Sequence, residues 1–153
     1  MENAVDEDGV PVRAGCYRDH PGHNGNGLVY AEHQDISTLL EKLLHQLQTV
    51  NLASVGTLEA CVTIARFVHG FLVIHPFQNG NGRMARLTVS YLLREIGAPF
   101  VVPLTNGHQR NRKHYFRALR AGDRGNISVL VLYILECYAR VCDNAILLIL
   151  LSF

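Results

Sequence analysis

The sequence predicts an all-α domain, a helical bundle with one small β-hairpin near its N-terminus. Apolar residues recur at helical spacing through most of the chain after residue 36, and two long segments are apolar on most sides. The only β signal of any weight lies between Tyr17 and Tyr30. With 153 residues, the chain has the length of one domain and can bury about two thirds of its unfolded surface in a single core.

The first two helices are predicted from their apolar pattern and their end signals. Residues 37–48 carry leucines at helical spacing, and Asp35 or Ser37 can cap this segment. Residues 58–74 are apolar on most sides, which indicates a helix at the centre of the bundle. Thr57 can cap this second helix and Pro76 ends it.

Three further helices follow. Residues 83–96 form the first of them, with Gly97 just after its last turn and Pro99 beyond. Residues 106–119 and 127–140 form the other two, and the last is again apolar on most sides. The predicted bundle therefore has a short loop, residues 75–82, between two helices that contribute to the core.

The predicted hairpin rests on turn chemistry alone. Gly22, Gly25, Asn26 and Gly27 lie between short runs that end at Tyr30. A two-stranded hairpin is marginally stable without further support. On the residues alone, a glycine-rich surface loop is the simpler interpretation.

Residues 75–86, His-Pro-Phe-Gln-Asn-Gly-Asn-Gly-Arg-Met-Ala-Arg, are the most informative stretch of the chain. Gly80 and Gly82 allow the backbone to turn with positive φ and to expose N–H groups. The helix that follows directs the positive end of its dipole to the same place. The stretch therefore predicts a site for a polyphosphate.

Three side chains add chemistry to this loop. Arg83 and Arg86 are three residues apart, so they share one face of a helix and can both bind phosphate oxygens through charge-assisted hydrogen bonds. His75 lies just before the turn and can take a proton near neutral pH. The base and the phosphate site are thus predicted to be neighbours.

This stretch resembles the signature of the Fic (Fido) family, H-P-F-x-[D/E]-G-N-G-R-x-x-R, and differs from it at one fixed position, Asn79. The resemblance extends over most of residues 15–140. It implies a Fic-type helical bundle over residues 15–143, preceded by an N-terminal tail (1–14) and followed by an apolar C-terminal tail (144–153). A last helix packed on the core, or a chain cut inside a longer protein, would both explain that apolar end.

The resemblance implies a protein adenylyltransferase, which moves AMP from ATP to a Ser, Thr or Tyr hydroxyl of a target protein and releases pyrophosphate. In that scheme His75 is the general base, and Phe77 anchors the loop in the core. The nucleotide-binding residues would be Gly80, Asn81 and Gly82 for the α-phosphate and Arg83 and Arg86 for the β- and γ-phosphates.

The resemblance also gives the hairpin a role as a flap that holds the target protein. Its edge could accept an extended segment of the target by strand addition. The flap residues expected to make this contact are Tyr17, Arg18, Val29 and Tyr30.

Asn79 occupies the position where the family carries a carboxylate that binds Mg²⁺ (or Mn²⁺). An amide oxygen is an uncharged and weaker ligand for such a cation, so we expect a loss of roughly 10–100-fold in metal affinity. Two alternatives therefore stay open. The chain could be an inactive pseudoenzyme that binds nucleotide or protein, or a Fic transferase that uses another nucleotide donor.

Regulation is the least defined part of the prediction. Many relatives carry an inhibitory helix of pattern [S/T]-x-x-x-E-[G/N]; here Ser37 and Glu41 approach it, but Lys42 follows. An ordinary amphipathic helix explains this segment better. Control would then come from a separate inhibitory partner or from missing sequence, or there would be no such control.

Charge and composition limit the possible partners. The net charge of +1 lacks the excess of positive charge that is typical of nucleic-acid-binding proteins. Arginines gather around the signature and in residues 110–124, which suits phosphate or an acidic partner, although a solvated helix face is the common explanation. Within the second cluster, Arg112 and Tyr115 could border the nucleotide, and helix packing explains them equally well.

The remaining features indicate a cytoplasmic protein. The four cysteines form no C-x-x-C pair, which favours free thiols in a reducing compartment. The N-terminus is acidic rather than a signal peptide, and the apolar run 145–151 is too short to cross a bilayer. The sequence leaves the oligomeric state open.

Overall fold

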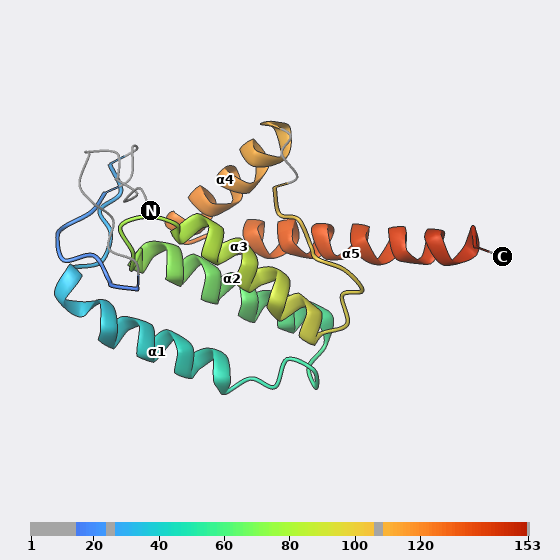
Figure 1. Cartoon of the computed structure of the whole chain (residues 1–153), viewed down its shortest axis with the longest axis horizontal. Coiled ribbons are helices and arrows are strands. Elements are labelled where there is room, and N and C mark those ends of the chain that lie inside the picture. Colours follow the sequence, from blue (N-terminus) through green and yellow to red (C-terminus); the bar gives the residue numbers. More distant parts are fainter. Residues whose placement is uncertain (1–14, 24–26, 106–108, 153) are drawn as a thin grey trace.

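The computed structural model describes residues 15–23, 27–105 and 109–152, and in these residues the protein is a bundle of α-helices (Figure 1). The helices are α1 (Ile36–Gln48), α2 (Thr57–Ile74), α3 (Asn81–Glu95), α4 (Gln109–Asp123) and α5 (Ser128–Leu150), with a short 3₁₀ turn, η1 (His33–Asp35), before α1. The predicted all-α bundle is confirmed.

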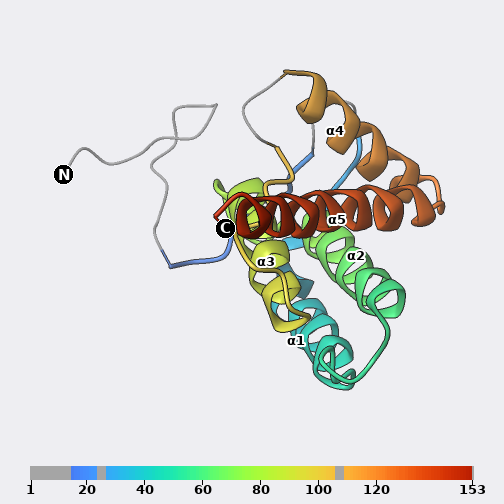
Figure 2. The ribbon, with the colours of Figure 1, turned by 90° about the vertical axis from the view of Figure 1, so that its right-hand side faces the viewer.

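Helix α2 is the centre of the bundle. It contacts α1, α3 and α5, which surround it in two views (Figures 1 and 2). Its buried residues include Ala60, Ile64, Val68 and Phe71. Among the described helices α2 is also the one long and apolar enough to cross a membrane, and its central position accounts for the same apolarity.

Helix α4 packs mainly on α5, and its last turn also meets α2. A Cβ placed on Gly122 would lie 2.6 Å from Cδ2 of His69, so only glycine fits there without a shift. His69 Nε2 lies 3.0 Å from a carboxylate oxygen of Asp123. Gly125, at φ 84°, then ends the helix in the left-handed conformation that favours glycine.

The observed helix bounds differ from the predicted ones mainly at the C-terminal ends. Helix α4 runs to Asp123 rather than to residue 119, because the glycine that stops it is Gly125. Helix α5 continues to Leu150, ten residues beyond the predicted end. Asp35 occupies the predicted cap position of α1, although its side chain makes no capping hydrogen bond.

The end of α5 is exposed rather than packed. Ala145 is its last buried residue, and every residue from Ile146 to Leu151 is more than half exposed. Figure 1 shows this part of the helix extending beyond the other helices. Of the two explanations left open for this apolar end, a final helix packed on the core does not describe these last turns.

The predicted hairpin is reduced, within the described residues, to one antiparallel bridge between His23 and Val29. The N–H of Tyr30 also donates to the carbonyl of Gly22, at 2.9 Å. Two of the predicted turn residues, Gly25 and Asn26, lie outside the described residues. The segment is held mainly by its contacts with the end of α2.

All four cysteines are free, as the sequence predicts. Cys61 and Cys137 are buried, and burial raises the pKa of the Cys61 thiol to about 11. Both thiols therefore act as small apolar groups of the core.

Candidate active site

His75 lies where α2 ends, in the left-handed region at φ 50° and ψ 60°. Its N–H still donates to the carbonyl of Phe71, at 2.9 Å, so the residue closes the last turn. Pro76 follows and cannot continue the helix. This backbone conformation turns the chain away from the helix axis and into the signature loop.

Two contacts fix the imidazole of His75. Its Nδ1 lies 3.2 Å from the carbonyl oxygen of Leu72. Its ring stacks on Tyr30, with 3.7 Å between centroids and 5° between planes. Because a carbonyl only accepts, Nδ1 carries the hydrogen, and the lone pair of Nε2 is left to take a proton.

The surroundings keep His75 neutral. Burial lowers the pKa of the imidazole, and the positive charge of Arg18 lowers it further, while the hydrogen bond to Leu72 acts in the opposite direction. A pKa below the ordinary value near 6.5 leaves the imidazole unprotonated at pH 7. His75 is therefore in the protonation state that a general base requires.

Arg18 fastens the N-terminal segment to the end of α2. Its Nε donates to the carbonyl of His75 at 2.8 Å, and its terminal nitrogens donate to the carbonyls of Ile74, at 3.0 Å, of His20, at 2.8 Å, and of Ala31. Two of these acceptors close α2, where carbonyls lack helical partners and the dipole favours a cation. Only 4% of Arg18 is exposed.

This geometry contradicts the expectation that Arg18 contacts a target protein, because the side chain is buried and its donors are bound to carbonyls. The Tyr30 ring also differs from this expectation, because it stacks on the His75 ring instead of only facing a target at the edge of the hairpin. Tyr17 and Val29 are exposed by 47% and 65%, so they remain available at the surface. These roles of Arg18 and Tyr30 have no signal in the sequence, since their partners are distant in the chain.

The signature loop is braced from within. The side-chain oxygen of Asn81 accepts the N–H of Phe77 at 3.0 Å, and its amide donates to the Phe77 carbonyl at 2.7 Å. The Phe77 ring packs near Phe71, with 6.4 Å between centroids. The Phe77 ring thus packs against the core, and Asn81 supports the loop through two hydrogen bonds that its place in the sequence does not reveal.

Helix α3 begins at Asn81, within the signature itself. Gly80 precedes it at φ 89°, a conformation suited to glycine. A Cβ on Gly80 would lie 3.7 Å from a guanidinium nitrogen of Arg83, and one on Gly82 would lie 3.3 Å from Arg86. The structure therefore brings both arginines to the glycine turn, as their spacing predicts, and within the described residues neither forms an ion pair.

Arg86 also faces a cavity of about 360 Å³, which it lines with Thr105, Arg112 and Phe116. Tyr115 is close enough for the charge of Arg86 to act on it: burial raises the pKa of this phenol to about 12, and Arg86 opposes the rise. The Tyr115 hydroxyl has no hydrogen-bond partner among the described residues. A position for Arg112 at the border of the nucleotide site was one of two alternatives left by its sequence, the other being helix packing.

The residues present do not fit a magnesium site of the carboxylate type. Asn79 offers one amide oxygen, and that oxygen accepts the N–H of Gly80 at 2.6 Å. Mg²⁺ in proteins is usually held by one or two carboxylates together with water and substrate phosphates. In the described part of the chain no group of three His, Cys, Asp or Glu side chains could hold a metal ion.

Comparison with known proteins agrees with the resemblance seen in the sequence. A model of the Fic/DOC family matches residues 2–93. Protein adenylyltransferase Fic of Drosophila virilis is 30% identical over 135 residues, which are 87% of this chain and 26% of that protein. A Fido domain-containing protein of Dictyostelium discoideum is 31% identical over 118 residues, 76% of each chain.

The fold has a solved counterpart. A Fic domain-containing signaling protein from Bacteroides thetaiotaomicron superposes with a TM-score of 0.72 at 22% identity, over 85% of this chain and 53% of that one. This chain spans about a quarter of the length of the Drosophila relatives. The family match covers more than half of the chain, and the glycine turn, the two arginines and His75 all lie inside it. The chain therefore belongs to the Fic/DOC family.

Proposed function

We propose that this chain is a protein adenylyltransferase that moves AMP from ATP to a Ser, Thr or Tyr hydroxyl of a target protein. The observation that carries the proposal is the neutral His75, whose Nε2 is free to accept a proton, next to a glycine turn to which Arg83 and Arg86 converge. A base beside a phosphate site is what transfer of a phosphoryl-linked group to a hydroxyl requires.

The glycine turn supplies the phosphate site. The first N–H groups of α3 have no helical partner and lie at the N-terminus of the helix, the positive end of its dipole. We assign the α-phosphate to these groups around Gly80, Asn81 and Gly82. Arg83 and Arg86 then take the β- and γ-phosphates through charge-assisted hydrogen bonds.

The reaction follows from this placement. Nε2 of His75 takes the proton of the target hydroxyl as its oxygen attacks the α-phosphorus. The bond from that phosphorus to the bridging oxygen of the β-phosphate breaks, and AMP is left on the target. Pyrophosphate departs with the electron pair, neutralised by Arg83 and Arg86, and the proton on His75 then passes to pyrophosphate or water. Any Mg²⁺ (or Mn²⁺) would enter with the nucleotide, and no step here depends on it.

The target is proposed to bind across the segment of the single bridge. Val29 and Tyr17 are exposed there, and the Tyr30 ring of the same segment stacks on His75. An extended target segment beside Val29 would lie near the base, which is how strand addition could present a hydroxyl for reaction.

Transfer is tested by incubating the protein with ATP labelled at the α-phosphate and a cell lysate, and following label on protein bands. We expect labelling that His75→Ala reduces by roughly 10²–10⁴-fold, the usual contribution of a general base. His45→Ala, at an exposed position of α1, is the matched control and should label normally. Labelling that survives His75→Ala would refute the assigned base.

Asn79 favours a second candidate, a module that binds nucleotide without transferring it, because its amide oxygen is a weak and already engaged metal ligand. Asn79→Asp distinguishes the two. We expect the variant to need roughly 10–100-fold less Mg²⁺ for half-maximal labelling. Identical metal dependence would show that position 79 is not a metal ligand, whereas ATP binding without labelling in both proteins would favour the binding module.

A further inference from the structure

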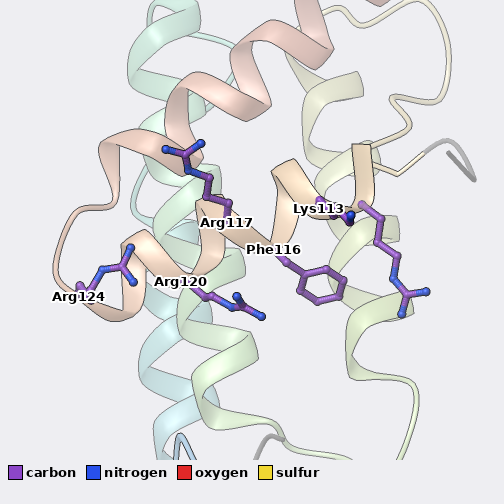
Figure 3. Close-up of a pocket in the computed structure, with 6 residues that line it drawn as sticks. Lys113, Phe116, Arg117, Arg120 and Arg124 are labelled. Atoms are coloured by element: carbon purple, nitrogen blue, oxygen red, sulfur yellow. The ribbon is translucent and has the colours of Figure 1, made fainter. Parts of the chain in front are cut away.

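A second cavity, of about 600 Å³, lies along the exposed side of α4, and we call it the basic groove. Among the described residues that line it, Phe116 is accompanied by five cations, which are Arg112, Lys113, Arg117, Arg120 and Arg124. Figure 3 shows Lys113, Phe116, Arg117 and Arg120 following one another along α4, with Arg124 just after its end. A cavity of this size is in the range of ligand sites.

The charges of the basic groove are not balanced locally. None of the described residues that line the cavity is a carboxylate. The ion pairs of the described residues are those of His20 with Asp19 and of His69 with Asp123, so none of the five cations takes part in one. The protein as a whole carries a net charge of only +1. This concentration of unpaired charge on one helix therefore fits an anionic ligand.

The basic groove adjoins the signature site. Arg112 and Phe116 line both this groove and the smaller cavity that contains Arg86. A ligand lying in the groove therefore approaches the phosphate-binding arginine from the side of α4.

The dimensions favour a peptide. Residues 112 to 124 span about 18 Å along a helix at 1.5 Å per residue. An extended peptide of about five residues has the same length at 3.3 Å per residue. Arginine forks match carboxylates as well as they match phosphates.

The same features disfavour single-stranded nucleic acid. Sites of that kind combine cations with several stacking rings. The groove has one ring, Phe116, and the Arg112 guanidinium lies over it at 5.6 Å from the ring centre. Within the part of the chain that the structure describes, no second aromatic side chain lines the cavity.

We propose that the basic groove binds an acidic peptide segment, about five residues long, of the protein that is modified. The assignment of that segment to a modified target rests on the proposed transfer activity, whereas the binding itself does not. Such docking would add affinity outside the reacting hydroxyl and would select targets with an acidic stretch near it.

The test is the binding of a fluorescein-labelled hexaglutamate peptide to the whole chain, followed by anisotropy at low salt. We expect binding that weakens as salt is added, and that falls roughly tenfold in Arg120→Glu/Arg124→Glu, because two attractions become repulsions. The control, Arg66→Glu/Arg94→Glu, reverses two exposed arginines on α2 and α3 and changes the net charge equally. It should bind like the unchanged protein.

Three outcomes would overturn the proposal. Equal loss in both double variants would mean that only net charge matters. A labelled DNA hexanucleotide that binds more tightly than hexaglutamate, and loses this binding in the Arg120/Arg124 variant, would assign the groove to nucleic acid. Loss of ATP binding in the Arg120/Arg124 variant, with no change for the peptide, would assign it to the nucleotide. Since none of these readouts requires AMP transfer, failure of the labelling experiment leaves the groove result intact.

Discussion

The signature loop and the basic groove both depend on arginine, yet they use it in opposite ways. Arg18, behind the loop, is buried and donates to four backbone carbonyls. The groove cations on α4 are exposed and, within the described residues, without a carboxylate partner. A guanidinium with four of its five N–H groups bound to carbonyls holds the fold, whereas one whose donors are free is available to a ligand.

This contrast predicts that loss of arginine has opposite consequences in the two regions. Behind the loop, substitution should cost stability and move the base. Along the groove, it should leave stability unchanged and alter binding alone.

The largest effect is expected from Arg18→Met. The substitution removes the partners of four carbonyls, two of them at the end of α2, and buried groups left without partners are costly. We expect the free energy of unfolding to fall by about 3 kcal/mol or more, measured by urea denaturation. Arg66→Met, at an exposed position of α2, is the control. A loss below about 1 kcal/mol for Arg18→Met would contradict the bracing role.

A smaller effect is expected from Tyr30→Ala, and it concerns pH. Burial lowers the pKa of His75, so removing the stacked ring should admit water and raise that pKa toward its ordinary value. The base works when neutral, so the acid limb of the activity profile should move to higher pH.

The shift can be followed without activity, by NMR titration of the His75 ring. Tyr30→Phe keeps the stacked ring and should leave the pKa of His75 unchanged. Tyr17→Ala is a second control, because its ring lies 5.8 Å from Phe77 rather than on the imidazole. A pKa of His75 that is the same with and without the Tyr30 ring would refute this assignment.

The smallest effect on stability is expected in the basic groove. Arg120→Ala and Arg124→Ala remove exposed, unpaired side chains, so each should change the free energy of unfolding by no more than about 0.5 kcal/mol. The same urea titration provides the measurement. A loss comparable to that of Arg18→Met would show that these cations support the fold and would remove the contrast between the two regions.

The sequence was sufficient for the features that depend on local pattern. The apolar run of α2 predicted a central helix, because a helix that is apolar on most sides must be covered on most sides. Gly80 predicted the turn, where φ is 89°, whereas Gly82, also expected to turn with positive φ, lies inside α3. The spacing of Arg83 and Arg86 predicted that both arginines reach this turn. The likeness to a family signature then gave the loop its chemistry.

Features made by distant partners could not be predicted. Arg18 binds carbonyls that lie up to 57 positions away, and backbone carbonyls have no sequence signature. The resemblance placed Arg18 and Tyr30 together in a flap, but only packing shows that one is buried and the other stacks on His75. The exposure of the last turns of α5 could not be predicted for a related reason, since an apolar run specifies a helix without specifying what covers it.

The left-handed backbone at position 75 carries a final consequence for how this domain can change over time. A residue with a Cβ is strained by about 1 kcal/mol in that conformation, and glycine is not. His75→Gly should therefore unfold at higher urea than His75→Ala, although both lack the base. Backbone strain at this position favours glycine, whereas the proposed general base requires histidine, so the imidazole could be lost without loss of the bundle.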